Sequence, residues 1–349
     1  MTDDIQSAAR LAKVVEISRG IHHGIALGDA ADHLTSTAPV LPGGVATQLT
    51  LATTEGLVRT LERAGRQLDH DWAHENLEAL RRWATAQGIP GVAPSRDASR
   101  SLLTTLPAYA VRRGNAPATV RVLRHGPAAL TAAGHRSLGA HALVRTLPFA
   151  VLVALHGPGF VWPVPELAGA THGHPLVGPV AVVGALLAAR GADRSVPLDA
   201  GWLDVLDAHV PEGGELLKTR VGTAIMAAAT DPQDPGQLAE LAPDRSALSV
   251  LAAAVYVVLS HPEPDQLLLA MALASFSSDK QSTSAVVGAL VGARHGSTPM
   301  LQLGAARLEL AWACDALATD LALTSMLTPL GKEPDGQAWL PSWPARYAV

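Results

Sequence analysis

The sequence predicts an all-α protein, and three observations support this. Hydrophobic residues make up 48% of the 349 residues but aromatic residues only 4%, so the apolar content comes mostly from Ala, Leu and Val. β-Branched and aromatic residues rarely gather into the alternating runs of a half-buried strand. Apolar residues instead recur at helical spacing. We expect a compact multi-helix domain over residues 1–330 and an irregular tail over residues 331–349.

Charge and composition argue against several classes of partner. The net charge is −5 and no basic block is present, so a nucleic-acid partner is not expected. Cys314 is the single cysteine, which excludes a disulfide within the chain and is typical of a reducing compartment. The N-terminal segment is acidic and polar, unlike a signal peptide. The longest apolar runs, 175–189 and 248–259, are shorter than the roughly 18–20 residues that cross a bilayer. We therefore expect a cytoplasmic protein without a membrane partner.

The first third of the chain predicts three helices. Leu11, Val14 and Ile17 give residues 8–27 one apolar face. At the end of this helix, chemistry alone favours a helix broken by glycines, with Asp29 as a local cap. Further helices are expected over residues 48–61 and 69–86. A Gly/Pro turn follows the third, and Ser95 is a plausible N-cap for another helix.

The rest of the chain contains further helical segments. Residues 137–149 are expected to hold a proline-interrupted core helix in which Arg145 forms a structural ion pair, unless they bind a ligand. A buried helix is expected within residues 170–189, with Thr171 as its N-cap and Pro175 near its first turn. Another buried helix should span 246–259, and a closing helix 301–321.

Residues 277–296, SSDKQSTSAVVGALVGARHG, organise the chain. Small residues in the second half are spaced so that a neighbouring backbone can come close, as at Gly288 and Gly292. Asp279 lies among serines in the polar turn before that helix. A helix N-terminus carries unpaired N–H groups and favours anionic ligands. The turn is therefore a candidate site.

This stretch resembles the signature of the ADP-ribosylglycohydrolase family, GGDTDT, a short spacer and then AGALAGAYYG. Three further motifs follow the family order. Gly24, Gly28, Asp29 and Ala30 match the family's G-x-x-x-GDALG. Six positions of residues 137–149 match its SNGNGALMRIAPL. Thr171, His172, His174 and Pro175 match its THxHP. The resemblance covers nearly the whole chain and implies the family's all-helical fold.

The resemblance also implies a chemistry that this sequence does not fully match. Family enzymes use a carboxylate cluster and two Mg²⁺ ions to orient ADP-ribose and a water molecule. Val45 and Ala46 stand where the family has paired aspartates, and Gln281 replaces the later one. The early glutamate position falls near Ser36, while Lys280 adds a positive charge where the cations would lie. Mg²⁺ needs several oxygen ligands, so we expect no metal centre here.

The resemblance nominates site residues at the matching positions. Asp279 and Asp29 are the candidate catalytic residues. Two histidines at i and i+2 do not share a helix face, so a zinc pair is not expected, and either histidine has a purely structural alternative. The candidate ligand-binding residues are Gly139, Arg145, Thr171, His172, His174, Lys280 and Ser282.

Three functions stay open. The ligand losses favour a pseudoenzyme that binds an ADP-ribose-like molecule or a protein partner. The alternatives are a divergent, metal-independent enzyme acting on an ADP-ribosyl or other N- or O-glycosidic bond, and a scaffold with a closed pocket. In the enzyme, Asp279, Asp29 or a histidine would supply acid–base chemistry. The sequence does not decide whether Asp32 or Glu55 restores a metal site.

Overall fold

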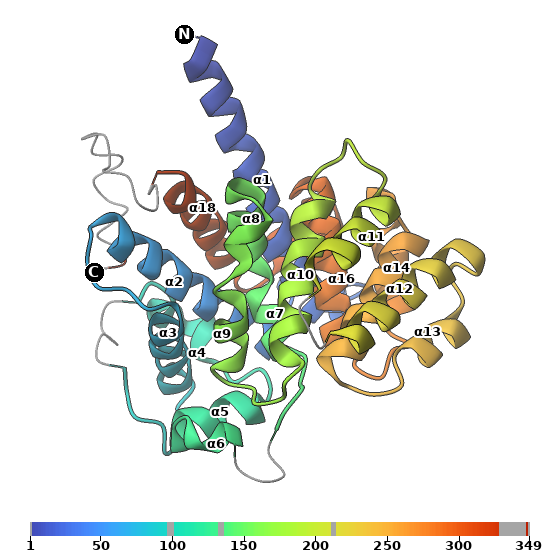
Figure 1. Ribbon diagram of the computed structural model, residues 1–349. Coiled ribbons are helices and arrows are strands. Elements are labelled where there is room, and N and C mark those ends of the chain that lie inside the picture. Colours follow the sequence, from blue (N-terminus) through green and yellow to red (C-terminus); the bar gives the residue numbers. More distant parts are fainter. Residues whose placement is uncertain (1, 96–100, 132–135, 211–213, 328–346, 348–349) are drawn as a thin grey trace.

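The regular structure consists of helices throughout the part of the chain that the computed structural model describes, residues 2–95, 101–131, 136–210, 214–327 and 347 (Figure 1). Within those residues the β-structure is limited to two isolated bridges, Leu41 with Leu308 and Gly139 with Ser246. The all-α prediction is confirmed. Apart from Tyr347, the predicted tail lies outside the described residues, as does the segment directly after Ser95.

Two helices form the centre, α1 (Thr2–Asp29) and α16 (Lys280–His295). Each carries small residues every fourth position. A Cβ atom added to Gly24 would lie 2.0 Å from the carbonyl oxygen of Gly288, and one on Gly20 would lie 2.1 Å from that of Gly292. The facing position in α16 moves toward its N-terminus as the position in α1 moves toward its C-terminus, so the helices are antiparallel and their backbones touch. The predicted close approach occurs, and its partner is the first helix.

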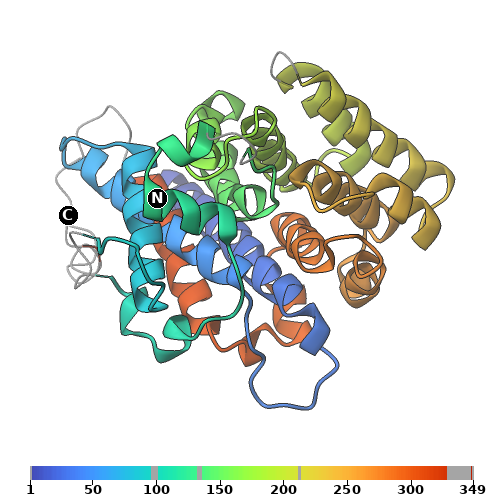
Figure 2. The ribbon, with the colours of Figure 1, turned by 90° about the horizontal axis from the view of Figure 1, so that it is seen from below.

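The other helices surround this pair. Figure 2 shows α1 in the middle, with the blue and teal helices on one side and the yellow and orange helices on the other. One side is built from α2 (Val45–Gly65), α3 (Trp72–Ala86), α4 (Pro107–Ala110), α5 (Pro117–His125) and α6 (Ala128–Thr131).

The other helices follow in chain order. Against the central pair lie α7 (His141–Thr146), α8 (Ala150–His156) and α10 (Val177–Gly191), and α9 (Val164–Gly169) packs on α7 and α10. The remaining helices are α11 (Leu198–His209), α12 (Glu215–Thr230), α13 (Pro235–Leu241), α14 (Ala247–Ser260), α15 (Leu267–Ala274), α17 (Thr298–Leu303) and α18 (Ala311–Leu327).

Two predicted boundaries are wrong. Helix α10 begins at Val177 with Leu176 as its N-cap residue, so Thr171 does not cap it. The closing helix is divided, because Gly304 adopts a left-handed conformation with φ +110° and ends α17. The predicted proline interruption is present, with a 3₁₀ turn at Leu147–Phe149 between α7 and α8. None of the described helices has the length and apolar character needed to span a bilayer.

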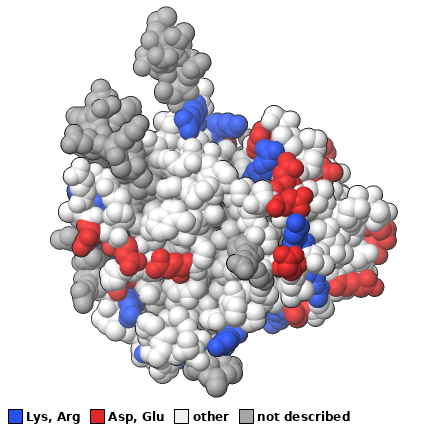
Figure 3. Space-filling view, viewed as in Figure 1, with Lys and Arg blue, Asp and Glu red and all other residues white. Residues whose placement is uncertain are grey.

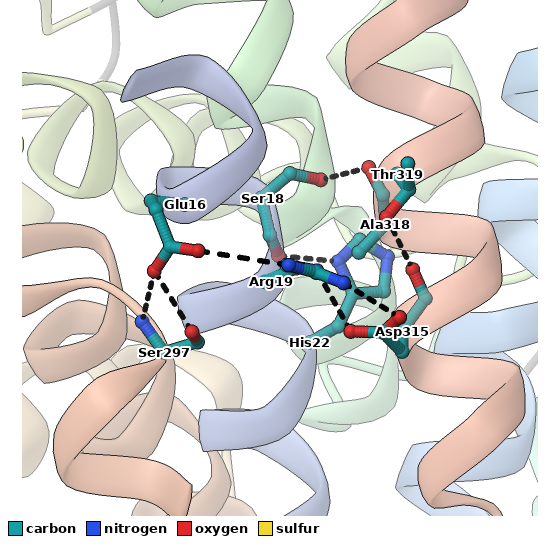
Figure 4. Close-up of polar contacts among 8 residues, drawn as sticks. All are labelled: Glu16, Ser18, Arg19, His22, Ser297, Asp315, Ala318 and Thr319. Carbon is teal, nitrogen blue, oxygen red and sulfur yellow. Dashed lines mark hydrogen bonds and ion pairs between the residues drawn. The ribbon is translucent and has the colours of Figure 1, made fainter. Parts of the chain in front are cut away.

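A polar network joins α1 to α18 (Figure 4). Arg19 donates a hydrogen bond from Nη2 to Asp315 at 2.8 Å, and its Nε forms an ion-pair contact with the same carboxylate at 2.7 Å. The Ser18 hydroxyl donates to the carbonyl of Ala318 at 2.7 Å. The His22 ring is held between the Ser18 carbonyl and the Thr54 hydroxyl, each at 2.8 Å. These bonds fix the rotation of α1 about its axis.

Charged groups are mixed on the surface. On the face drawn in Figure 3, Lys and Arg side chains are interspersed with Asp and Glu rather than gathered into a stripe. The charge distribution of this face therefore gives no continuous electrostatic footprint for a polyanion.

Substituting Gly288 by alanine should destabilise the fold strongly. The new Cβ would lie 1.9 Å from the carbonyl oxygen of Gly24, which belongs to the backbone and cannot move alone. We expect a loss of about 3 kcal/mol or more in the free energy of unfolding, measured by urea denaturation. Gly222→Ala is the matched control, because nothing lies within 4 Å of its Cβ position in α12. That control should gain about 0.5–1 kcal/mol, and equal stabilities would contradict the close crossing.

His22 should make stability depend on pH. Burial lowers the pKa of its ring from 6.5 to about 4. Between these values the unfolded chain binds more protons, so stability falls as the pH falls. The His22 contribution should be a loss of roughly 3 kcal/mol from pH 6.5 to pH 4. Unfolding of His22→Gln should lack that part of the dependence, whereas the exposed His70→Gln should keep it. Parallel pH profiles for all three proteins would rule the effect out.

Candidate functional site

Several helix ends meet around Asp29, the last residue of α1. Its carboxylate contacts the first turn of α2, and the charge of Asp279, the N-cap residue of α16, acts on it. Asp279 also acts on His141 at the start of α7, and His141 acts on His172 in the loop before α10. The structure thus brings together residues from most of the motifs that the sequence analysis singled out.

Asp29 caps a helix other than its own. Its Oδ2 accepts hydrogen bonds from the Thr47 backbone N–H at 2.8 Å and from the Thr47 hydroxyl at 2.7 Å. The prediction that Asp29 acts as a cap at the end of its own helix is therefore wrong, because the helix that it caps is α2. Burial raises the pKa of Asp29, and the negative charge of Asp279 raises it further, while the bonds from Thr47 and Gly44 oppose the rise.

Gly44 makes this arrangement possible. A Cβ atom there would lie 2.1 Å from Oδ1 of Asp29. Any side chain would therefore expel the carboxylate from the start of α2. Because Gly44 is the N-cap residue of α2 and has no capping side chain of its own, Asp29 supplies the missing acceptor.

Asp279 caps α16 in the usual way. Its side chain accepts from the Ser282 backbone N–H at 3.3 Å, and the residue is half-buried. Ser282 itself is buried. Lys280 points outward, where its ammonium pairs with Asp32 at 2.7 Å, and both side chains are about half exposed. Asp32 therefore does not join Asp29, although it lies only three positions further along the chain.

Arg145 lies completely buried behind the site. It donates hydrogen bonds to the Asn76 side chain at 3.3 Å, to the Leu167 carbonyl at 2.5 Å and to the Thr171 hydroxyl at 2.9 Å. No carboxylate in the described part of the chain is within ion-pair distance, so the expected structural ion pair is wrong. Burial lowers the pKa of Arg145 to about 9. Its bonds join α7 to α3, α9 and the histidine loop.

Arg145 also sets the orientation of His172 through Thr171. The Thr171 hydroxyl accepts from Arg145, and its own proton is available for Nδ1 of His172 at 2.8 Å. This hydrogen-bond pattern assigns the ring proton to Nε2. The position of a Cβ on Gly139 would be 3.4 Å from that Nε2, so the nitrogen faces the Gly139 loop. Burial, then Arg145, lowers the pKa of His172 well below 6.5, so the ring is neutral.

His174 is oriented separately. It is half-buried, and its Nδ1 accepts from the Leu176 backbone N–H at 3.1 Å, which helps the turn into α10. Among the described residues, the rings of His172 and His174 have different hydrogen-bond partners. Sequence analysis did not nominate Thr47 or His141, although Thr47 belongs to the segment matched to the family's aspartate pair.

The side chains present do not fit a dinuclear magnesium centre. Among the described residues, no group of three or more His, Cys, Asp or Glu side chains is placed to hold a metal ion. Asp29 is bound to Thr47, and Val45 and Ala46 carry no side-chain oxygen. Glu55 is fully buried against Arg59 and Arg82, each at 3.5 Å, so it does not restore the site either. Mg²⁺ requires more oxygen ligands than remain here.

The chemistry available is therefore that of hydrogen bonds and one buried acid. A neutral His172 offers an N–H donor, and the first turn of α16 offers backbone donors to a polar or anionic group. Two cavities of about 410 and 340 Å³ lie toward the other ends of α10 and α16 and do not include these residues.

Comparisons with known proteins agree with the motifs. The model of the ADP-ribosylglycohydrolase family matches residues 6–327. A solved structure described as an "ADP-ribosylglycohydrolase-related protein complex" has a TM-score of 0.55 and 20% sequence identity, covering 90% of this chain and 99% of its own. That similarity concerns the fold alone. A search of curated proteins found no match. Because the family match spans nearly the whole chain, this protein belongs to the ADP-ribosylglycohydrolase family.

Proposed function

We propose that this protein is a pseudoenzyme that binds an ADP-ribose-like ligand at the meeting point of α1, α2, α7 and α16 without magnesium. The observation that carries the proposal is the Asp29 carboxylate, which caps α2 where the family motif has paired aspartates. A carboxylate that accepts two hydrogen bonds at a helix start is a structural group. Because Asp29 is used in this way, one of the two carboxylates that the motifs retain is not available to bind a metal ion.

Several donors support binding. The Nε2–H of His172 faces the Gly139 loop, whose family counterpart holds the diphosphate of ADP-ribose through backbone N–H groups. Lys280 carries a positive charge at the first residue of α16. Helix N-termini and cations both favour phosphate groups. The same proposal places the protein in the cytoplasm, without nucleic-acid or membrane partners.

A second candidate is a metal-independent hydrolase of an ADP-ribosyl or other glycosidic bond. One observation favours it. Burial raises the pKa of Asp29, and a carboxylic acid with a raised pKa is the group that protonates a leaving oxygen in many glycosidases. The two candidate functions differ in whether the protein hydrolyses a substrate. Release of ADP-ribose from an ADP-ribosylated substrate in the presence of EDTA would favour the hydrolase.

Calorimetric titration with ADP-ribose should show binding that magnesium does not change. The site lacks the oxygen ligands to hold Mg²⁺, so the dissociation constant should be the same in Mg²⁺ and in EDTA. Binding only in Mg²⁺ would contradict the proposed metal-free site. No binding in either condition would contradict the proposal of an ADP-ribose-like ligand. The scaffold with a closed pocket would then be the remaining function.

Replacing Lys280 by alanine should weaken ADP-ribose binding several-fold, because a nearby ammonium attracts the diphosphate. Lys218→Ala is the matched control. Its ammonium also pairs with one exposed carboxylate, Asp207 at 2.8 Å, but lies on α12. The control should bind as the unmodified protein does. Equal affinities for all three proteins would remove Lys280 from the site.

A further inference from the structure

A second cavity lies at the opposite end of the central helix pair. It has a volume of about 340 Å³ and is lined by residues of α1, of the loop after α10 and of the end of α16. This volume is within the range of small-molecule pockets. About 15 residues of α16 separate it from Asp279, which corresponds to about 22 Å along the helix axis. The cavity is therefore distinct from the candidate site.

Positive charges predominate in its lining. Lys13 comes from α1, Arg194 from the loop and Arg294 from α16, and His295 adds a ring. Glu16 is the one acidic side chain in the lining. Its carboxylate is already engaged, because Oε2 accepts from the Ser297 hydroxyl at 2.8 Å and Oε1 lies 3.7 Å from Arg19 (Figure 4).

The two guanidinium groups are held by carbonyls rather than by carboxylates. Arg294 Nη1 donates to the Asp193 carbonyl at 2.7 Å and to the Gly191 carbonyl at 3.2 Å. Arg194 Nε donates to the Arg294 carbonyl at 2.6 Å. Within the described chain, no carboxylate lies within 4 Å of either guanidinium or of the Lys13 ammonium.

Such an arrangement places like charges close together. Arg294 is partly buried, and after burial the positive charge of Arg194 is the largest cause that lowers the pKa of Arg294. Carbonyl bonds fix the guanidinium groups without a directly paired carboxylate, and the charges of Asp193 and Glu263, which lie beyond ion-pair distance of Arg294, oppose the lowering of its pKa. An anion in the cavity would relieve the repulsion and use the free N–H donors.

One feature of the fold opposes an anion here. The C-terminus of α16 carries partial negative charge. Two of its last carbonyls are already bonded, that of Gly292 to Gly296 N–H at 2.8 Å and that of Arg294 to Arg194. These bonds reduce the partial negative charge at the C-terminus of α16. The positive charges of Lys13, Arg194 and Arg294 exceed what remains of it.

We propose that this cavity, lined by Lys13, Arg194 and Arg294, binds the phosphate group of a small molecule. Arginine forks match the geometry of phosphate oxygens, and the ammonium of Lys13 adds a point charge. The volume exceeds what a single phosphate fills, so the ligand carries a further organic part. This site is independent of the proposed ADP-ribose site.

The test is calorimetric titration of the full chain with inorganic phosphate at low salt. Arg194→Ala should weaken binding about tenfold or more, as expected for a lost charge-assisted hydrogen bond. Arg124→Ala is the matched control, because Arg124 Nε also donates to one backbone carbonyl, that of Pro90 at 2.9 Å, and is not in the cavity lining. It should bind phosphate as the unmodified chain does.

A second variant distinguishes a loss of phosphate binding from a loss of folding. Lys13 is exposed, so Lys13→Ala should keep the melting temperature while weakening phosphate binding several-fold. Lys218→Ala should leave phosphate binding unchanged, because that ammonium lies on α12, outside both proposed sites. Absence of phosphate binding by the unmodified chain would overturn the proposal. Equal affinities for Arg194→Ala, Lys13→Ala and Arg124→Ala would also overturn it.

Discussion

The backbone contact between α1 and α16 is the constraint on which the rest of the structure depends. Gly20, Gly24 and Gly28 face Gly292, Gly288 and Ser284 so closely that a Cβ atom on any of the three α1 glycines would overlap the backbone of α16. Because the pair is antiparallel, the end of α1 meets the start of α16. That geometry places Asp29 near Asp279. The other end of the same pair places Lys13 near Arg294 and forms the distal cavity. One crossing therefore positions both regions that carry function in our proposals.

The start of α2, where Val45 and Ala46 carry no side-chain oxygen, depends on a cap from another helix. With Gly44 at the N-cap, the helix has no acceptor of its own, and the Cβ-free position leaves room for Asp29. Asp29 then accepts from the Thr47 amide and hydroxyl and becomes buried. A carboxylate used in this way gains helix-capping stability but is less available to a cation. Gly44 at the N-cap position and the capping of α2 by Asp29 are thus parts of one local arrangement.

Much of the fold could be predicted from the sequence because helical spacing and small residues are local signals. The spacing in residues 285–293 predicts a close neighbour, but only the tertiary structure identifies that neighbour as α1. Thr171 carries the chemistry of an N-cap, yet Arg145 and His172 use its hydroxyl. Arg145 was expected in an ion pair, but threonine, asparagine and carbonyl partners take it instead. Such partners come from α3 and α9, which no local pattern around residue 145 reveals.

The charge balance decides which part of a ligand the candidate site can accept. Without a cation, Asp279 repels a diphosphate, and Asp29 moderates this repulsion to the extent that it is protonated, since burial raises its pKa. Attraction then has to come from Lys280, from the first turn of α16 and from neutral donors such as His172. Lys280 is shared with Asp32, so the net field is weak. The candidate site therefore has to combine a weak attraction of Lys280 for the diphosphate with hydrogen bonds to the sugar and the base. The distal cavity, with three cations and one engaged carboxylate, attracts a phosphate mainly through charge.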